Sequence, residues 1–241
     1  MRVFKLFVGF LLVAVIVSAL EHKFNHASRG YVQSADAARI LAVKTATDVA
    51  SYFPANAAAR RYTLDAAQSK FIAHALAGGL LWFKGHDHLV AVRDFTGEAQ
   101  FDPDAPSASS LQINAKTASM VETSSVFTDQ QKQIINKELR EIVLLPEQYP
   151  DIVFKSTNVT GKATSANQYD LKIAGALTLH GVTRQITIPT RVTITGNGMR
   201  AEGEFSINRS DFGVKATSVM HRLIRVRDKV KFNFDIVGHQ P

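Results

Sequence analysis

Apolar and polar residues alternate along most of the chain from Tyr62 onward, and this alternation predicts β-strands. Residues two apart on a strand point to the same face, so a run with this period has one apolar face. The clearest runs lie late in the chain, at residues 169–178, 185–195, 199–208 and 229–237. Less regular runs precede them at residues 62–77, 88–101, 109–117 and 152–159. The sequence therefore predicts an all-β fold of eight mostly antiparallel strands.

Strands with one apolar face must hide that face, either by closing into a barrel or by stacking as a sandwich. Closure also removes exposed sheet edges, and we expect a barrel. An eight-stranded barrel is either filled by its side chains or leaves room for one small ligand. The inward positions mix large residues with Gly97, Gly175 and Gly203, which favours a partly empty interior. The dipeptide Asn197-Gly198 predicts a tight hairpin between two of the late strands.

One helical pattern interrupts the strands, within the stretch from Phe127 to Asp151. Its apolar residues recur at helical spacing, and Pro146 ends the pattern. We expect a helical insertion that packs on the outside of the barrel or caps one end. The residues of the predicted apolar stripe are Ile134, Ile135, Leu139, Ile142 and Val143.

The first 61 residues have a different pattern. Arg2 and Lys5 precede an apolar run of 15 residues from Leu6 to Leu20, which is typical of an export signal. The run is shorter than the roughly 20 residues that span a bilayer as a helix, which favours a cleaved signal peptide over an uncleaved membrane anchor. Residues 21–61 are expected to form a linker, with a helix expected within residues 34–53. We therefore expect a periplasmic protein, either released or tethered to the inner membrane.

Composition excludes some kinds of chemistry. The chain has no cysteine, which excludes disulfides, Cys-ligated metal sites and a thiol nucleophile. Its formal net charge of +7 favours anionic partners such as lipid headgroups or phosphates. The export signal and the lack of a recognisable binding module argue against nucleic acid. No pattern in the sequence predicts an oligomeric state.

Four ordered motifs resemble those of the YceI-like family of polyisoprenoid-binding periplasmic proteins. They are "YTLDAAQSKF" (62–71), "YPDIVFKST" (149–157), "GALTLHGVTRQITIP" (175–189) and "FSINRSDFGV" (205–214). The resemblance covers residues 62–238 and implies a lipocalin-like barrel that holds a long isoprenoid lipid or a quinone-like molecule, with no catalytic activity and no cofactor. The stretch "AGGLLWFKGHDH" (77–88) resembles a subgroup with a Gly-His-Asp/Asn-His motif.

An apolar chain inside such a barrel would be held mainly by burial, since each methylene removed from water contributes about 0.8 kcal/mol. Such a site needs no catalytic residue. The inward residues expected to line it are Leu111, Ile113, Phe154, Leu171, Ile173, Ile188, Phe205 and Phe232.

Polar residues expected near strand ends are candidates for the rim of this site, where a lipid headgroup would lie. For each of them a structural role is the competing interpretation. His180 would hold a turn, Arg209 would pair with an acid at a bend, and the basic run around Arg225 would be a solvated face or would meet lipid phosphates or an anionic membrane surface. The candidate rim residues are His86, His88, His180, Arg209, Arg222 and Arg225.

His86 and His88 also support an alternative function. Two imidazoles on one face of a strand can ligate a metal, which would make the chain a metal- or haem-associated redox or enzymatic protein. No acid follows at the spacing of a cupin site, so a polar rim without metal is favoured. A third hypothesis is a structural or stress-related module with a filled lumen. Trp82 and Phe83 would either guard the barrel mouth or belong to the core.

Overall fold

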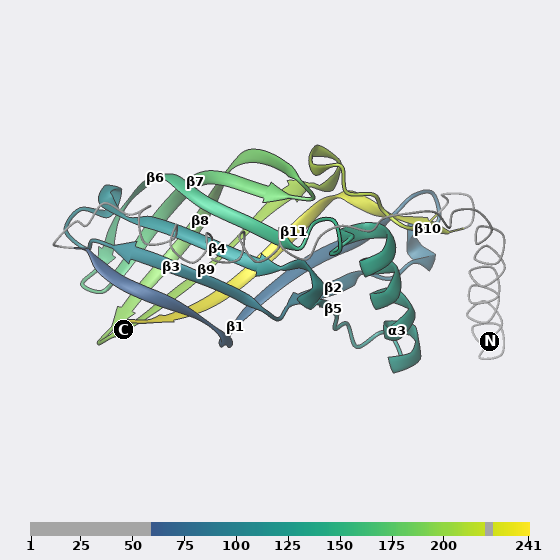
Figure 1. Cartoon of the computed structure of the whole chain (residues 1–241), viewed down its shortest axis with the longest axis horizontal. Coiled ribbons are helices and arrows are strands. Elements are labelled where there is room, and N and C mark those ends of the chain that lie inside the picture. The colour runs from purple at the N-terminus through teal and green to yellow at the C-terminus, as the bar shows by residue number, and fades with distance from the viewer. Residues whose placement is uncertain (1–58, 220–223) are drawn as a thin grey trace, which may run out of the picture. The chain divides into compact units, whose positions relative to one another are not determined.

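Eight strands hydrogen-bond in a closed antiparallel ring in the computed structural model, which describes residues 59–219 and 224–241 (Figure 1). The order around the ring is β1-β3-β4-β6-β7-β8-β9-β11, and β11 pairs back onto β1. The predicted barrel is therefore confirmed. The bounds are β1 (Arg60–Gly78), β3 (Phe95–Phe101), β4 (Ser110–Lys116), β6 (Asp151–Ser165), β7 (Gln168–Leu179), β8 (Val182–Thr195), β9 (Gly198–Asn208) and β11 (Ile224–His239).

Some predictions lie outside the described residues. They are the signal or anchor segment 1–20, nearly all of the linker 21–61 with its expected helix, and the candidate rim residue Arg222. No helix within the described part of the chain is long and apolar enough to cross a membrane.

Three short strands extend the ring at one end. The predicted strand 88–101 is interrupted at residues 93 and 94, and its first part, β2 (His88–Val92), pairs with the second half of β1. β5 (Met120–Glu122) pairs with β2, and among the described strands it has no partner on its other edge. β10 (Ser218–Val219) pairs with β11. At this end the wall of the barrel is therefore open beside β5.

The helical insertion covers that opening (Figure 1). It consists of α3 (Asp129–Glu138), which begins at a Thr128 capping box and continues as the π-helix η4 (Leu139–Leu144). The Asn136 side chain accepts a hydrogen bond from the Glu122 backbone N–H at 2.7 Å, which ties the helix to the free edge of β5. Of the two placements expected for the helix, on the outside of the barrel or at one end, it has the second (Figure 1).

The π-helical turn changes which apolar residues face the barrel. The Leu145 N–H donates to the Arg140 carbonyl, five residues back, so the turn contains one extra residue. Leu144 is buried as a result, whereas Ile142, expected in the apolar stripe, is 46% exposed. The prediction for Ile142 was wrong because it assumed a regular α-helical period. Leu145 then takes a left-handed conformation just before Pro146, and the helix ends there.

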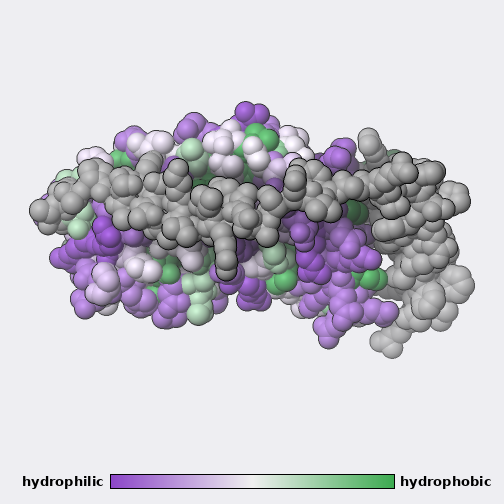
Figure 2. Space-filling model, viewed as in Figure 1, coloured by the Kyte–Doolittle hydropathy of each residue, from purple (hydrophilic) through white to green (hydrophobic). Residues whose placement is uncertain are grey.

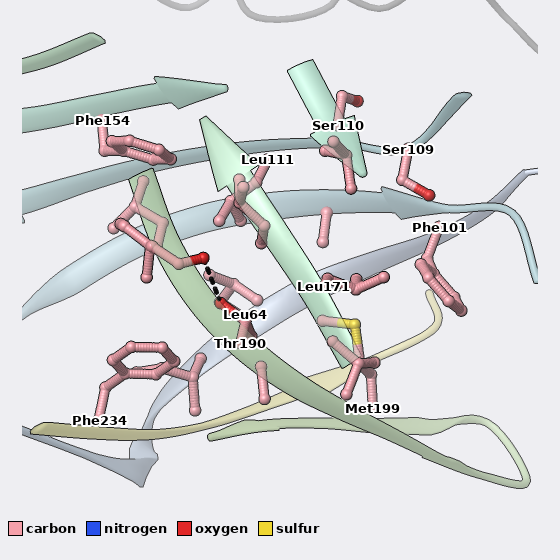
Figure 3. Close-up of a pocket in the computed structure, with 18 of the residues that line it drawn as sticks. Leu64, Phe101, Ser109, Ser110, Leu111, Phe154, Leu171, Thr190, Met199 and Phe234 are labelled. Atoms are coloured by element: carbon pink, nitrogen blue, oxygen red, sulfur yellow. Dashed lines mark hydrogen bonds between the residues drawn. The ribbon is translucent and has the colours of Figure 1, made fainter. Parts of the chain in front are cut away.

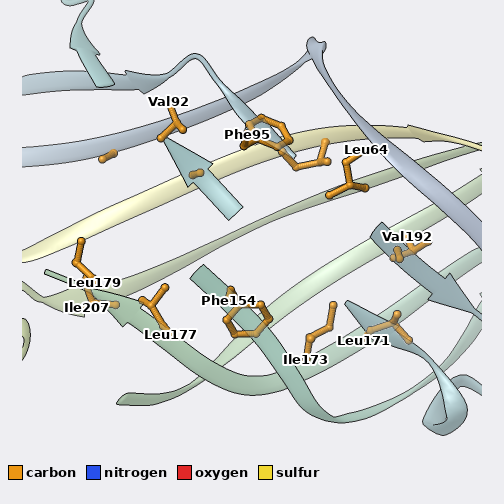
Figure 4. Packing of buried hydrophobic residues seen from close by; sticks show 14 of the residues in the cluster. Leu64, Val92, Phe95, Phe154, Leu171, Ile173, Leu177, Leu179, Val192 and Ile207 are labelled. Carbon is orange, nitrogen blue, oxygen red and sulfur yellow. The ribbon is translucent and has the colours of Figure 1, made fainter. Parts of the chain in front are cut away.

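The alternation along the strands is the one predicted. In β7, Leu171 and Ile173 are buried while Asp170 and Lys172 are exposed, so one face of the strand lines the interior and the other meets solvent. Figure 4 shows buried side chains from several strands gathered inside the barrel. On the face shown in Figure 2, the atoms over α3 are mainly hydrophilic.

The inward glycines do not leave empty space. A Cβ atom on Gly175 would lie 2.6 Å from Phe154 Cζ, and one on Gly203 would lie 2.7 Å from Phe234 Cζ. Gly97 has Leu64 Cδ1 at the corresponding distance of 2.7 Å. Neighbouring side chains therefore occupy the space over these glycines, so the unfilled space of the interior lies elsewhere.

Two hairpins join the late strands. His180 and Gly181 form the loop between β7 and β8, and both have positive φ, 53° and 74°, as a type I′ turn requires. The predicted hairpin between β8 and β9 is present, but its loop is Gly196-Asn197 rather than Asn197-Gly198, because Gly198 already pairs with Thr195. Gly196 alone has positive φ, 56°, which fits a turn with glycine at its first central position.

Candidate functional site

The barrel contains two cavities that share part of their lining. The first cavity has a volume of about 120 Å³ and lies between the strands of the closed ring (Figure 3). The second cavity has a volume of about 190 Å³ and lies toward α3 and η4. The two cavities adjoin and together form the lumen of the barrel. The residues that line both are Phe71, Ala115, Ile152, Leu177 and Phe205.

Every residue that the sequence predicted as lining does border this lumen. Phe205 lines both cavities and Phe232 lines the second. The residues that line the first cavity alone are Leu111, Ile113, Phe154, Leu171, Ile173 and Ile188.

Several inward-facing side chains are only partly buried. Ile113, Ile188 and Phe205 face the interior, yet each keeps accessible surface. Protein cores are normally packed as densely as organic crystals, so an inward residue with accessible surface borders unfilled space. Phe232 and Phe234 show the same combination. The lumen is therefore hollow beside these inward residues of β4, β8, β9 and β11.

Four phenylalanines meet where the two cavities adjoin. The rings of Phe205 and Phe232 stack with centroids 4.9 Å apart, and Phe71 meets Phe232 edge-on at 6.0 Å. Phe234 is 6.4 Å from both Phe71 and Phe205. Phe234 lines the first cavity and Phe232 the second, so the cluster marks the junction between them.

The two cavities differ in the polar groups that they contain. The polar residues of the first cavity carry no charge, and one of them, Thr190, donates its hydroxyl to the Ile188 carbonyl at 3.3 Å (Figure 3). The second cavity is also mostly apolar, but titratable or charged side chains enter its lining. They are His88, Glu138, Arg209 and Lys215.

His88 is held by a buried carboxylate. Its Nδ1 lies 2.8 Å from Glu122 Oε2, and the Glu122 side chain is fully buried. Glu122 also accepts backbone hydrogen bonds from Leu89 at 3.1 Å and from Ser124 at 2.7 Å. Burial raises the pKa of Glu122, but the hydrogen bonds from His88, Ser124 and Leu89 outweigh burial and hold the pKa below its usual value. The ring stacks on Phe127 at 5.2 Å.

This pairing fixes what His88 can offer to a ligand. A carboxylate on Nδ1 favours the tautomer with the proton on that nitrogen, which leaves Nε2 as an acceptor in the neutral ring. Glu138 lines the same cavity, and burial raises its pKa although the nearby His88 partly opposes the shift. The second cavity therefore contains an imidazole and a carboxyl group, whereas the polar groups of the first cavity are all neutral.

Sequence reasoning missed Glu122 and Glu138, although each occupies an apolar position in the sequence pattern of its element. Glu122 shares a strand face with Met120, two residues earlier, and both are buried. Glu138 follows Ile135 by three residues and so belongs to the apolar stripe of the helix. An acid on an apolar face is the pattern that both share.

The other candidate rim residues lie elsewhere. His86 precedes β2, is exposed and meets the edge of Phe127 at 5.7 Å, so the strand argument that paired it with His88 does not hold. His180 sits in the β7–β8 turn with its ring 4.0 Å from Tyr149, and neither cavity includes it. Its pKa is lowered by burial and, to a smaller extent, by Lys215.

Arginines near the second cavity have two different positions. Arg209 lines the cavity, and its Nη1 donates to the Val214 carbonyl at 2.8 Å. Arg225 is exposed and lies outside both cavities. Trp82 and Phe83 are exposed as well, so of the two roles expected for them the structure excludes the core.

The geometry gives no support to a metal site. Within residues 59–219 and 224–241, no three His, Asp or Glu side chains come close enough together to hold a metal ion. His88 uses Nδ1 for Glu122, and Phe127 contacts both His86 and His88.

Comparison with solved structures supports the fold. BcnA from Burkholderia cenocepacia superposes with a TM-score of 0.57 over 72% of this chain and 98% of its own, at 23% identity. A structure described as a polyisoprenoid binding domain from Saccharophagus degradans superposes with a TM-score of 0.54 over 75% of this chain and 98% of its own, at 14% identity. At these identities the likeness shows the fold alone.

Sequence relatives give the family. The chain is 32% identical over 143 residues to a UPF0312 protein of Azotobacter vinelandii and 34% identical over 134 residues to one of Pseudomonas fluorescens. These matches cover 57% and 50% of this chain, and the chain spans just under two thirds, 66% and 61%, of the relatives' lengths. The sequence profile of the YceI-like domain matches residues 62–238, which form the barrel described above. The chain therefore belongs to the YceI-like domain family.

Proposed function

We propose that this protein binds a long, apolar, isoprenoid-type lipid in the lumen of its barrel. The observation that carries the proposal is the row of inward side chains, such as Ile113 and Ile188, that keep accessible surface along a lumen lined almost entirely by apolar residues. Each methylene placed there would contribute about 0.8 kcal/mol. The polyisoprenoid-binding description of the Saccharophagus domain supports the same class of ligand.

The polarity of the lumen also supports an orientation for the lipid. The apolar tail lies in the first cavity, where the polar lining residues are uncharged. A hydroxyl or carbonyl at the head of the lipid lies in the second cavity, where His88 and Glu138 can accept a hydrogen bond and Lys215 can donate one. This arrangement suits a prenol or a quinone-like headgroup.

The protein holds this lipid without transforming it. Binding an apolar chain by burial requires no nucleophile and no cofactor. Export to the periplasm, with or without a membrane tether, completes the proposal and places the carrier where it can exchange lipid with a membrane.

The test is to identify what copurifies with the protein. The full chain, expressed in two different bacterial hosts, would be extracted with organic solvent, and the extract analysed by mass spectrometry. We expect about one prenyl compound per protein molecule. The Ala99→Phe variant, whose added ring would fill the first cavity, should copurify with much less lipid because Ala99 is buried in its lining.

A matched control separates lumen filling from general damage. Ala174→Phe adds the same ring to the outer face of β7, away from both cavities, and should retain the lipid. Circular dichroism would check that both variants are folded. Wild-type protein that carries no prenyl compound from either host would contradict the proposal, as would equal lipid content in the two variants.

A further inference from the structure

The loop between β1 and β2 exposes a group of large apolar side chains. Leu80 is 77% exposed, Trp82 is 55% exposed and Phe83 is 64% exposed. The loop backbone is nevertheless ordered, since Lys84 N–H donates to the Leu81 carbonyl at 2.9 Å and Gly85 N–H to the Trp82 carbonyl at 3.0 Å. A structured loop that presents apolar side chains to solvent is typical of an interaction site.

A second loop extends the apolar surface beside the first. Val126 is 57% exposed, and its neighbour Phe127 meets His86, at the end of the β1–β2 loop, with ring centroids 5.7 Å apart. Apart from Ile142 in the helical insertion, the large apolar residues that are exposed in the described part of the chain all belong to these two loops. The exposed apolar surface is therefore concentrated at the end of the barrel that carries α3.

A basic recess lies directly beside Trp82. It has a volume of about 320 Å³, and its lining includes Gly78, Gly79 and Trp82 together with Arg209, Arg225 and Arg227. The Arg227 Nε donates to the Ala77 carbonyl at 2.9 Å, and its Cγ lies over Gly78, where a Cβ atom would be 2.8 Å away. The side chain is thus held in place by the β1 backbone.

The acid in the recess is already engaged. Asp228 accepts hydrogen bonds from the Ser210 backbone at 3.0 Å and from its hydroxyl at 2.7 Å. Arg209 Nε lies 3.9 Å from the same carboxylate. The lining therefore contains three guanidinium groups and one carboxylate, which gives a net positive charge.

We propose that the β1–β2 loop and this recess form a docking surface for an anionic phospholipid bilayer. Trp82 and its apolar neighbours enter the interface between headgroups and acyl chains, where tryptophan is enriched in membrane proteins. Arg225 and Arg227 meet the lipid phosphates, as basic residues do beside an anionic leaflet. The apolar side chains match the acyl chains of such a bilayer, and the excess of guanidinium groups matches the negative charge of its phosphates.

The docking surface is continuous with the lumen. Arg209 and Val226 line both the recess and the second cavity. A bilayer bound at the recess would therefore lie at the end of the lumen where a lipid headgroup is proposed. Docking goes beyond the proposed function and does not depend on it, because an empty barrel presents the same loop and the same arginines.

Trp82 is the single tryptophan of the chain and gives a direct test. Its fluorescence would be recorded for the full chain with vesicles of phosphatidylcholine alone, and with vesicles that also contain phosphatidylglycerol. Brominated acyl chains in either vesicle quench a tryptophan that enters the interface. We expect a blue shift and strong quenching with the anionic vesicles, and little of either with neutral vesicles or at high salt. Because the apolar run at residues 6–20 is expected from its sequence to bind vesicles on its own, fluorescence rather than cosedimentation is the readout.

Paired variants identify the contacts. Lys84 and Arg225 are exposed, and the variant Lys84→Gln/Arg225→Gln removes two charges beside the loop. Each basic residue near an anionic surface contributes about a fivefold factor, so the ratio of docked to undocked protein should fall about 25-fold. Lys162→Gln/Lys172→Gln removes two charges from the outer wall of β6 and β7 and should leave quenching unchanged.

A variant of the apolar residues completes the test. Leu80→Ser/Phe83→Ser keeps Trp82 as the probe and should abolish most of the quenching without unfolding the barrel, since both side chains are largely exposed. Unchanged Trp82 emission with every vesicle would overturn the proposal and would indicate that another macromolecule covers the loop. Equal quenching in neutral vesicles, or an equal loss in the Lys162→Gln/Lys172→Gln control, would also overturn it.

Discussion

The first and second cavities are built from the same alternating strands but are closed in different ways. Around the first cavity, every neighbouring pair of strands is hydrogen-bonded and the polar lining is uncharged. Beside the second cavity the wall ends at β5, a helix takes the place of a strand, and His88 and Glu138 enter the lining. The difference suggests a division of roles, in which the closed half holds an apolar chain and the half closed by the helix offers polar contacts and a route of entry.

The largest expected effect is a difference in the free energy of unfolding that is lost when a side chain is truncated in each half. Phe154 is 6% exposed and belongs to the closed half, so Phe154→Ala should lower the free energy of unfolding by about 3 to 5 kcal/mol. Leu139 faces the second cavity from η4 and is only partly buried, so Leu139→Ala should cost about 1 to 2 kcal/mol. Urea denaturation followed by circular dichroism measures both values. Equal losses would mean that the helix is as integral to the core as the strands are.

The next effect concerns the buried carboxylate behind His88. Glu122→Gln should lower the free energy of unfolding at neutral pH by about 1 to 3 kcal/mol, because it weakens a buried network of three hydrogen bonds. The pKa of Glu122 is lowered in the folded protein, so its contribution is present above the unfolded glutamate pKa and is lost as the pH falls through the folded value.

Denaturation curves across the acidic range test the sign of this dependence. The free energy of unfolding should differ less between wild type and Glu122→Gln as the pH drops below about 4.3, the usual pKa of a glutamate side chain. Glu147 is exposed, and Glu147→Gln should differ little from wild type at any pH. A difference between wild type and Glu122→Gln that grows on acidification would mean that the sign was assigned wrongly.

A third prediction tests the proposed positions of tail and headgroup. Ala201→Phe fills the first cavity and should weaken the binding of geranylgeraniol by about tenfold, since room for two methylene-sized groups is worth about 1.6 kcal/mol. Farnesol, which is shorter, should lose less affinity. Ala75→Phe fills the second cavity instead and should weaken both alcohols to the same extent. Titrations of purified protein with each alcohol would give the affinities. If Ala201→Phe lost the same affinity for geranylgeraniol and for farnesol, the result would argue against a tail in the closed half.

The smallest expected effect concerns Glu138. Burial raises its pKa, so the ionised form is unfavourable in the folded protein and stability is lost as the pH rises from the unfolded through the folded pKa. Glu138→Gln should therefore raise the free energy of unfolding at neutral pH by about 0.5 to 1 kcal/mol, and the gain should vanish in acid. Glu141→Gln, on an exposed part of the insertion, is the control and should give no such gain.

Period-two patterning predicted the strands and the residues that line the interior, while the barrel rather than a sandwich was expected from the need to remove sheet edges and from the motif resemblance. A strand with one buried face carries its register in its sequence, so residues such as Leu171 and Ile188 could be assigned to the interior before any coordinates were known. The motif resemblance added the family, and the family profile confirms it over residues 62–238.

Long-range pairing could not be read in the same way. His88 and Glu122 lie 34 residues apart and meet only because β2 and β5 are neighbours. The junction formed by Phe71, Phe205 and Phe232 likewise depends on how three strands curve together. The error at Ile142 had a local cause, since a π-helical turn changes the period that the prediction assumed. In each case, which side chains meet or are buried depends on tertiary contacts or on an irregular helical turn, and a regular strand or helix period does not contain that information.

A crystal structure of the protein with its copurified lipid would test the central claim most directly. The account predicts continuous density for one chain that passes the phenylalanine junction, with its apolar end beside Leu111 and Leu171 in the first cavity and its polar end within hydrogen-bonding distance of His88 or Glu138. A first cavity closed by side chains, or a chain that lies in the reverse direction, would contradict it.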